Sequence, residues 1–354
     1  MKYVLAFLLA LLSFTAAQAD RIAIAVLDLD AKGEGISQGI ADVLTENVRF
    51  EFSKQESLDL VARDKMIELT KEKAIQLSGC TDVSCAVKIG KAINVQKIVV
   101  GTVVKLGDKG VLYLRTIDVE REKVECSEKY ETGSEAQNLD NAAPILVMRI
   151  AGCILEQRAR EILIKNPKDA RAYYNLGLAL SSRFKKVSEA EVYFRKAIEL
   201  NPKFTDAYCT LGVTLEAQGK YEEAEQVYRK VVRLEPNDGF SHYFLGGALQ
   251  QQAKLKEAET EYREATRLTP NNPHAHYDLG IVLWDQGNLE EAEKELRKAV
   301  WLKEDFPIAL VNLGVLLDAK NKRKEAREFW ERALKYEASP ERIDQINKRL
   351  AEPD

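Results

Sequence analysis

The sequence predicts an α+β protein, in which an N-terminal α/β domain with a mixed sheet precedes an all-α solenoid of helical repeats. Three observations support this prediction. In the first third of the 354 residues, short apolar runs alternate with amphipathic segments. Through the remainder a 34-residue pattern recurs, which is typical of stacked repeats. The composition, 45% hydrophobic and 31% charged, is that of a chain able to bury a core.

The first 19 residues predict a secretory signal. Lys2 precedes an apolar run over residues 3–14, and a small-x-small cleavage site ends at Ala19. We therefore expect cleavage after Ala19, a mature chain from Asp20, and a periplasmic or secreted protein. The run is too short to span a bilayer, and no other stretch approaches the ~20 apolar residues that a spanning helix needs. No cysteine precedes Cys80, so the usual lipoprotein anchor has no acceptor beside the signal.

Net charge is divided unevenly along the chain. Residues 20–143 contain 17 Lys and Arg against 22 Asp and Glu, whereas residues 144–354 contain 34 of each. Neither part has the basic excess that neutralises the phosphates of a nucleic acid. We therefore expect no nucleic-acid partner.

The α/β domain is expected over residues 20–138. Apolar runs predict strands at 21–29, 58–61, 97–106, 111–119 and 124–130. Helical periodicity and capping residues predict helices at 36–52, 64–77 and 84–93. The last three strands follow one another through short turns, the first of them at 107–110, which is typical of hairpins. This order gives a mixed sheet with helices on one or both faces.

The repeat pattern occupies the second half of the chain. Leucine-glycine pairs end at Gly177, Gly212, Gly246, Gly280 and Gly314, at intervals of 35, 34, 34 and 34 residues. A second register of alanines follows at Ala190, Ala224, Ala258, Ala292 and Ala326. Prolines separate successive units at Pro167, Pro202, Pro236 and Pro270. The longer first interval comes from one residue inserted near 183–186.

This pattern resembles the tetratricopeptide repeat. The family places an aromatic residue four before the glycine, where this chain has Tyr173, Tyr208, His242, His276 and Leu310. It places another on the second helix, where this chain has Phe194, Tyr228, Tyr262, Leu296 and Trp330. The resemblance implies two antiparallel helices per unit that cross closely at the glycine. It implies five repeats over 169–338, a linking helix or half-repeat over 139–168 that couples the two domains, and a capping helix over 339–354.

In this family the first helices line a concave groove that binds peptides. Counted from each glycine, the groove candidates are Arg171, Tyr174, Asn175, Thr210, Tyr243, Phe244, Tyr277, Asp278 and Asn312. Tyrosines beside polar residues suit peptide recognition, because they give contact area at low entropy cost. The alternative for each residue is packing between helices. The Lys/Asn clamp with which some members hold a terminal carboxylate is absent, so we expect no chaperone-tail binding.

Residues 20–130 resemble a second family. The stretches IAIAVLDLDAKGEGIS, LDLVARDKM, SGCTDVSCAVKIGKAINVQKIVVGTV and YLRTIDVEREKV follow one another in order. Together they look like the α/β domain shared by the curli-secretion assembly component and its envelope relatives. The resemblance implies a role in assembly or secretion at the bacterial envelope. The anchor cysteine and a hairpin of membrane-spanning length are missing, so it does not imply a pore.

The five cysteines are an odd count. Cys80 and Cys85 lie in a loop-to-helix segment, and export would place them in an oxidising compartment. We therefore expect a structural disulfide between them, with free buried thiols as the alternative. Cys126, Cys153 and Cys209 are expected to be buried small hydrophobic residues, although the sequence leaves a second disulfide open.

No arrangement of residues indicates catalysis, a metal site or a cofactor. Gly33, Gly35 and Gly39 follow a strand, but their spacing is not the dinucleotide G-x-G-x-x-G, and the loop is acidic. A flexible turn is therefore expected there. His242 and His276 occupy equivalent repeat positions and are expected to be half-buried packing residues. Neither a G-x-S-x-G nor a G-x-x-x-x-G-K-[ST] motif occurs.

These features predict a non-enzymatic, exported scaffold that binds a protein or peptide partner in the repeat groove and serves cell-envelope assembly. The alternative is an outer-membrane secretion or polymer-export accessory that forms homo-oligomers through the α/β domain. A third hypothesis is an enzyme or ligand sensor that uses the loop over residues 28–39.

Overall fold

The computed structural model describes residues 21–32, 37–55, 57–72, 80, 82–106, 109–132, 139, 142–181, 187–337 and 339–351. The expected signal sequence, part of the acidic loop, half of the 107–110 turn and the whole 183–186 segment lie outside the described residues. The chain divides into two compact units, residues 1–202 and 203–354. The α/β domain lies in the first unit, together with the first helices of the repeat array.

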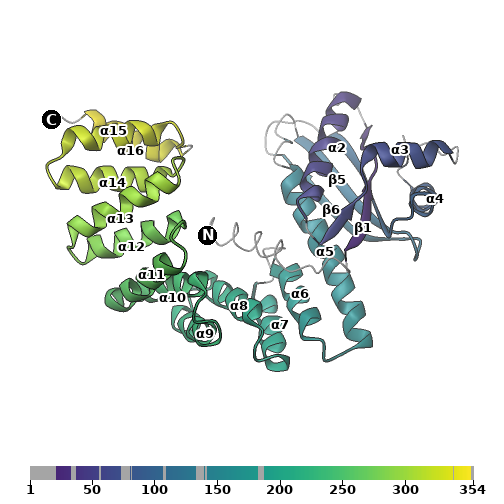
Figure 1. The fold of residues 1–354 in the computed structure, drawn as a ribbon. Coiled ribbons are helices and arrows are strands. Elements are labelled where there is room, and N and C mark those ends of the chain that lie inside the picture. The colour runs from purple at the N-terminus through teal and green to yellow at the C-terminus, as the bar shows by residue number, and fades with distance from the viewer. Residues whose placement is uncertain are drawn as a thin grey trace. The chain divides into compact units, whose positions relative to one another are not determined.

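The first unit is built on a mixed sheet (Figure 1). The described strands are β1 (Ile22–Val26), β2 (Asp30–Lys32), β3 (Leu58–Leu60), β4 (Lys97–Leu106), β5 (Lys109–Asp118) and β6 (Lys123–Glu131). Their order is β3-β1-β4-β5-β6, with β2 also beside β4. β1 runs parallel to β3 and β4, whereas β5 is antiparallel to β4 and β6. The mixed sheet predicted from the sequence is therefore confirmed.

The strand predicted over 21–29 is interrupted. β1 ends at Val26, and pairing with β4 resumes at Asp30, where β2 begins. Between the two strands the Leu27 N–H donates to the Val99 carbonyl at 3.0 Å. The chain thus continues along β4 with a short break in the ladder.

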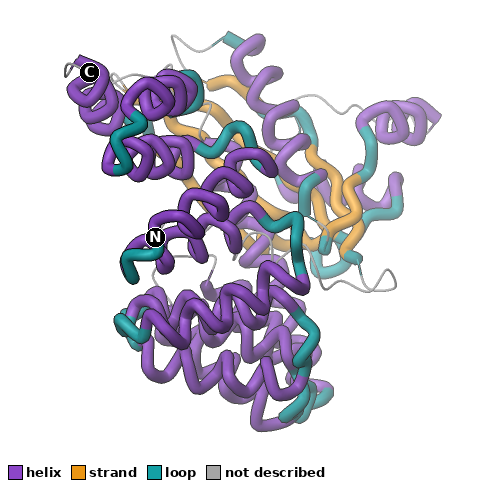
Figure 2. Tube along the Cα trace, turned by 60° about the vertical axis from the view of Figure 1, so that its left-hand side comes forward, coloured by secondary structure: helices purple, strands orange, loops and turns teal. Residues whose placement is uncertain are grey.

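Helices cover both faces of this sheet, as Figure 2 shows. The helices of the first unit are α2 (Gln38–Ser53), α3 (Arg63–Glu72), α4 (Val83–Ile93), α5 (Ala142–Lys165), α6 (Ala170–Ser181) and α7 (Val187–Leu200). α2 and α5 share one core with Ile24 and Val26, and α3 and α4 share the other with Ala25. Because successive strand residues point to opposite faces, two apolar faces require two helix layers.

α5 belongs to the core of the sheet and also packs against α6. Leu146, Val147 and Ile150 are fully buried in the core that α5 shares with α2. The segment predicted as a linking half-repeat is therefore also a structural element of the α/β domain. The first helix pair of the array consequently starts from a helix that is anchored in the sheet.

A disulfide joins Cys126 on β6 to Cys153 on α5, with the Cα atoms 6.1 Å apart. Both cysteines are buried, as expected, but they are bonded to each other rather than free, which is the second disulfide that the sequence left open. The pairing requires α5 to lie against β6, and nothing in the local sequence indicates that contact. Cys80 and Cys85 are joined in a second disulfide next to α4, and Cys209 is free and half-buried.

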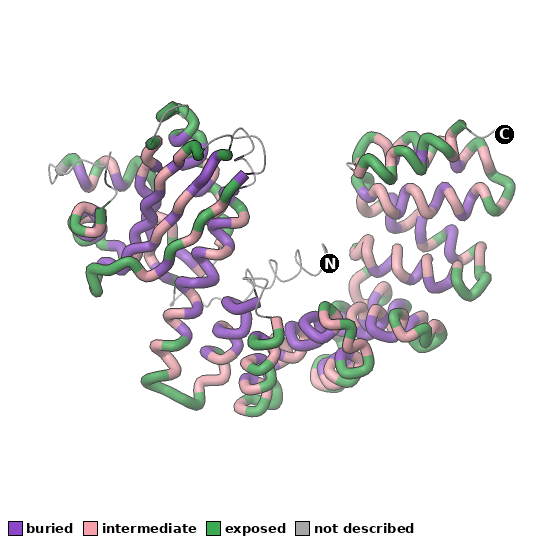
Figure 3. Tube along the Cα trace, turned by 180° about the vertical axis from the view of Figure 1, so that it is seen from behind, coloured by how far each residue is buried: buried purple, intermediate pink, exposed green. Residues whose placement is uncertain are grey.

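The second unit is a stack of helix pairs. Its described helices are α8 (Thr205–Ala217), α9 (Tyr221–Leu234), α10 (Gly239–Gln251), α11 (Leu255–Leu268), α12 (Pro273–Asp285), α13 (Leu289–Leu302), α14 (Pro307–Ala319), α15 (Arg323–Leu334) and α16 (Pro340–Ala351). Buried positions follow the inner sides of these helices, as Figure 3 shows. The all-α solenoid that the sequence predicts is confirmed. No described helix is both long enough and apolar enough to cross a membrane.

A glycine lies where the two helices of each pair cross. On α10, a Cβ added to Gly246 would come within 2.8 Å of the ring of Tyr262 on α11. The equivalent contacts join Gly177 to Phe194, Gly212 to Tyr228, Gly280 to Leu296 and Gly314 to Trp330. These are the residues that the repeat pattern marks. The glycine position and the bulk opposite it thus set how closely the helices approach.

The two equivalent histidines have a role beyond packing. His242 Nδ1 lies 2.7 Å from Glu261 Oε2, and its Nε2 lies 3.1 Å from the carbonyl of Pro236. His276 makes the same two contacts one repeat later, to Glu295 and Pro270. Each imidazole is buried and links the turn that precedes its repeat to the second helix of the same repeat by these two contacts.

We expect that replacing Cys126 and Cys153 together by Ala lowers the free energy of unfolding by about 3–4 kcal/mol, because the bond closes a loop of roughly 28 residues in the unfolded chain. Urea unfolding monitored by circular dichroism measures the difference. With a strong thiol reductant present, the variant and the wild type should converge. A difference that persists under reduction would mean that packing, rather than the bond, is responsible.

Gly246 and its neighbour Gly247 form a matched pair on α10. A methyl group at Gly246 meets the Tyr262 ring, whereas one at Gly247 lies 3.7 Å from the Tyr262 hydroxyl. We expect G246A to lower the free energy of unfolding by about 1–3 kcal/mol through overpacking. G247A should raise it by up to about 1 kcal/mol, because alanine favours helix more than glycine does. Equal effects in urea unfolding would contradict the close crossing.

Candidate functional site

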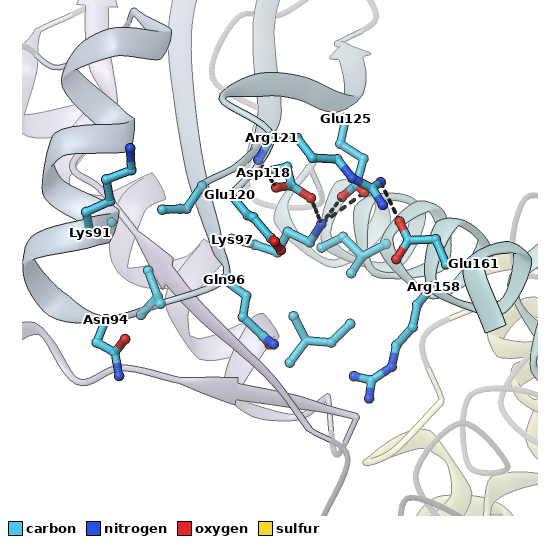
Figure 4. Close-up of a pocket in the computed structure, with 15 residues that line it drawn as sticks. Lys91, Asn94, Gln96, Lys97, Asp118, Glu120, Arg121, Glu125, Arg158 and Glu161 are labelled. Atoms are coloured by element: carbon cyan, nitrogen blue, oxygen red, sulfur yellow. Dashed lines mark hydrogen bonds and ion pairs between the residues drawn. The ribbon is translucent and has the colours of Figure 1, made fainter. Parts of the chain in front are cut away.

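The first unit contains a cavity of about 400 Å³ at the amino ends of β1 and β4 (Figure 4). The strand ends, the turn after β5, the end of α4 and one side of α5 line it. Its volume is in the range of small-molecule sites. None of the residues that the sequence singled out lines it.

Charged side chains of this cavity pair with one another, as the dashed lines of Figure 4 show. The Lys97 ammonium group donates to Asp118 Oδ2 at 2.6 Å and to Glu125 Oε1 at 2.9 Å. Burial acts to raise the pKa of Asp118, but hydrogen bonds from Lys97 and from the Arg121 backbone N–H outweigh it and hold that pKa below its ordinary value. Arg121 also pairs with Glu161 on α5.

This pairing limits what the cavity offers chemically. An ammonium group held between two carboxylates is not available as a nucleophile. The described lining residues include no serine, threonine, cysteine or histidine. The cavity lies between the sheet and α5, and ion pairs among its own side chains neutralise charges that line it. Only the hairpin register, which places Lys97 opposite Asp118, could have indicated it from the sequence.

The acidic loop after β1 is also held by ion pairs. Asp28 Oδ1 accepts a hydrogen bond from Arg49 at 2.7 Å, and its other oxygen lies 3.4 Å from Arg63. The buried Arg49 side chain donates to the Val26 carbonyl as well. Ion pairs therefore hold Asp28, whereas Gly33 and Gly35, where a flexible turn is expected, lie outside the described residues.

In the second unit, the first helices of successive pairs bring several predicted groove residues together. We call this surface the first-helix face, and it carries Glu216, Tyr243, Phe244, Tyr277, Asp278 and Asn312. The Tyr243 hydroxyl donates to Asp278 Oδ2 at 2.8 Å. One repeat later, Asn312 Nδ2 donates to the Tyr277 hydroxyl at 2.8 Å. Each bond joins a first helix to the next one, so the face is continuous across three repeats.

Aromatic rings fill the space beside these hydrogen bonds. Phe244 stacks on Tyr228 with ring centroids 5.7 Å apart and meets the edge of Tyr243 at 5.5 Å. Tyr243, Phe244 and Tyr277 are each only half-buried. The face therefore combines rigid apolar area with polar atoms, which suits recognition of an extended chain.

Two predicted groove residues do not face solvent. Thr210 and Tyr174 are fully buried, so the prediction is wrong for both. The Thr210 hydroxyl donates to the Asp206 carbonyl in its own helix, and the Tyr174 ring packs 5.8 Å from Phe194 between α6 and α7. The distance from the glycine correctly predicts that these residues lie on a first helix. Which residues of that helix are buried, however, depends on how the neighbouring helices pack against it.

The remaining candidates of the first unit lie on α6. Arg171 is exposed, and its guanidinium carbon lies 6.0 Å from the centroid of the Tyr174 ring. Asn175 is half-buried. Both residues remain candidates for partner contact.

Two carboxyl groups on the first-helix face titrate unusually. Burial raises the pKa of Asp278 to about 6, although the hydrogen bond from Tyr243 acts to lower it. Burial alone raises the pKa of Glu216 to about 7. Burial, followed by the charges of both carboxyls, also raises the pKa of Tyr243. Glu216 is not among the residues predicted from the sequence. Its place four residues after Gly212, on the face that holds the groove positions of the repeat, is the signal that indicates it.

Comparison with known proteins identifies the repeats. Models described as TPR repeat or tetratricopeptide repeat match residues 170–204, 193–226, 248–287 and 273–306. The chain thus contains tetratricopeptide repeats, as its pattern indicates. An uncharacterized protein of Methanocaldococcus jannaschii is 40% identical over 58 residues, which are 16% of this chain and 66% of that protein.

Solved repeat proteins resemble the chain over about half its length. YrrB, described as a TPR protein with an unusual peptide-binding site, is 25% identical, with 54% of this chain and 97% of YrrB covered and a TM-score of 0.45. PilF of Pseudomonas aeruginosa is 25% identical, with coverage of 51% and 82% and a TM-score of 0.47. MamA of Desulfovibrio magneticus RS-1 is 24% identical, with coverage of 48% and 96% and a TM-score of 0.45.

We expect Glu216 and Asp278 to make the protein less stable at pH 8 than at pH 5. A carboxyl whose pKa is higher in the folded chain stabilises the fold at low pH, and that contribution is lost as the pH rises through the folded pKa. E216Q/D278N should therefore reduce this loss by about 4 kcal/mol. Urea unfolding at both pH values measures it. A pH dependence of stability that is unchanged in E216Q/D278N would contradict the burial of the two carboxyls. The control is E222Q/E331Q, which changes two exposed glutamates of second helices and should leave the pH dependence as it is in the wild type.

Proposed function

We propose that this protein is an exported, non-enzymatic scaffold that binds a protein or peptide partner on the first-helix face and serves assembly of the bacterial cell envelope. The observation that supports it most directly is the continuous row of half-buried aromatic and hydrogen-bonding side chains formed by Tyr243, Phe244, Tyr277, Asp278 and Asn312. A row of this kind lets one extended chain contact several repeats at once, so many weak contacts add up.

The exported location rests on two observations. The first 19 residues have the composition of a secretory signal. The disulfides Cys80–Cys85 and Cys126–Cys153 are bonds that persist in an oxidising compartment such as the periplasm. The envelope role itself rests on the resemblance of residues 20–130 to the curli-assembly type of α/β domain.

The alternative function is an outer-membrane secretion or polymer-export accessory that forms oligomers through its α/β domain. One route to such oligomers, pairing of sheet edges, is opposed by the composition of β6. Of its nine residues, five are charged, among them Lys123, Lys129 and Glu131, and charged side chains discourage strand addition at an edge. Oligomers formed in this way would therefore need another surface of the domain.

Panning a random 12-residue peptide display library on the purified protein tests the proposed function. Phe240 is 54% exposed and lies on α10 three residues before Tyr243, so it shares the first-helix face. We expect F240A to weaken binding of the selected peptides about 5- to 30-fold, as loss of a central aromatic contact does. The matched control is W301A, because Trp301 is 69% exposed on the second helix α13.

Each result of this panning bears on the proposal. Peptides that bind the wild type and W301A equally and F240A weakly support it. A library that yields no enriched peptide, or peptides that bind F240A as tightly as the wild type, would sink it. Thermal unfolding of both variants confirms that the exposed substitutions leave the fold intact.

A further inference from the structure

Charge is segregated between the two kinds of helix in the second unit. The first helices α8, α10, α12 and α14 contain no Lys or Arg, and their acidic residues are Asp206, Glu216, Asp278, Asp285 and Asp318. Each of the second helices α9, α11, α13 and α15 contains at least three Lys or Arg. Asp318 pairs with Arg323 of α15, whereas Glu216 and Asp278 have no ion pair among the described residues. The first helices therefore offer negative charge that a partner of opposite sign complements.

The second helices neutralise their own charges. Arg229 pairs with Glu257 at 2.6 Å, and the equivalent pairs one and two repeats later join Arg263 to Glu291 and Arg297 to Glu325. Two glutamates on these helices, Glu225 and Glu293, each accept hydrogen bonds from Lys and Arg side chains. Burial acts to raise the pKa of both carboxyls, but these hydrogen bonds outweigh it and lower the pKa to about 2. The second-helix surface therefore needs no external cation.

Glu216 and Asp278 lack such cations. Among the described residues, the Glu216 carboxylate has neither a hydrogen-bond nor an ion-pair partner, and Asp278 accepts only from the Tyr243 hydroxyl. The pKa of Glu216 is therefore about 7, whereas the pKa of Glu225 and of Glu293, which pair with more than one cation, is about 2. A cation close to these two groups would remove the cost of burying their charges.

The buried hydroxyl group of Tyr228, on the second helix that pairs with α8, also lacks a partner among the described residues. Tyr228 is fully buried, and its hydroxyl has no hydrogen bond within the described part of the chain. One repeat later, the equivalent Tyr262 hydroxyl donates to Gln250 Oε1 at 2.9 Å, and Gln250 occupies the place that Glu216 has on α8. The charge of Glu216 raises the pKa of Tyr228 after burial does, so the two groups lie within electrostatic reach of each other. A buried polar atom without a partner costs free energy that a donor from a ligand would recover.

The surrounding rings suit a cation as well. Tyr243 lies 5.9 Å from Tyr262 and 5.5 Å from Phe244, measured between ring centroids. Both carboxyls act on the pKa of Tyr243 and of Tyr262, so they lie within electrostatic reach of the same two rings. Aromatic faces attract ammonium and guanidinium groups, and Arg stacks on them most readily.

We infer that the first-helix face binds a basic peptide segment, whose Arg or Lys side chain is held by Glu216 and Asp278 against the rings of Tyr243 and Phe244. This inference rests on the proposed function and names the chemistry of its partner. The aliphatic and aromatic residues that flank the basic side chain pack along α10 and α12. Acidic segments are rejected, because the first helices would place further negative charge beside them.

The test uses fluorescence anisotropy with a labelled decapeptide in which Arg alternates with Leu and Tyr. A second probe replaces every Arg by citrulline, which keeps the shape and removes the charge. We expect the Arg probe to bind the wild-type protein at least 10-fold more tightly than the citrulline probe. In E216Q/D278N this advantage should fall to about 2-fold or less. E222Q/E331Q removes the same charge from exposed sites of α9 and α15 and should keep the full advantage.

Two outcomes overturn the inference. One is equal binding of the two probes by the wild-type protein, and the other is an equal loss in E222Q/E331Q, which would reveal only net charge. The peptides selected by panning separate this failure from failure of the proposed function. Selected peptides that depend on Phe240 but show no excess of Arg or Lys overturn the basic-segment inference and leave the scaffold function standing. A library that yields no enriched peptide overturns both.

Discussion

The close crossing of a glycine against a large side chain is the constraint on which the repeat array depends. Gly212, Gly246, Gly280 and Gly314 each bring a first helix against the bulk of the following helix. This contact fixes the distance and the rotation of each pair, and the repeated spacing then places first-helix residues at regular intervals. The hydrogen bond from the Tyr243 hydroxyl to Asp278 in the next repeat depends on that regular spacing, because the two groups bond only when they lie about 3 Å apart.

The same geometry separates two surfaces with different chemistry. On the second helices, charges of both signs are paired from repeat to repeat, so that this surface is solvated and self-sufficient. On the first helices, Glu216 and Asp278 lie within electrostatic reach of the rings of Tyr243 and Tyr262, and neither carboxyl pairs with a cation among the described residues. Surface pairs contribute little stability each, whereas buried unpaired charges are costly. Glu216 and Asp278 place such a cost on the first-helix face, where we propose that the partner binds.

The first unit shows how a repeat array is attached to an α/β domain. α5 fills one layer of the sheet's core, is bonded to β6 through Cys126 and Cys153, and packs along α6. A linker made of flexible chain would leave the first pair free to move. Because α5 packs both in the core of the sheet and against α6, the first helices of the array are part of the α/β unit.

The sequence by itself determined the repeat register, the crossing residues and the mixed sheet, because these depend on periodic patterns of apolar and small residues. It also indicated the helices that carry the candidate site. The tertiary structure alone decided that Cys126 meets Cys153 and that Thr210 and Tyr174 are buried. It also decided that the Tyr228 hydroxyl, within electrostatic reach of Glu216, has no hydrogen bond in the described part of the chain. These facts depend on which helix covers which side chain. Contacts between residues far apart in the chain leave no periodic trace, so only the packed fold reveals them.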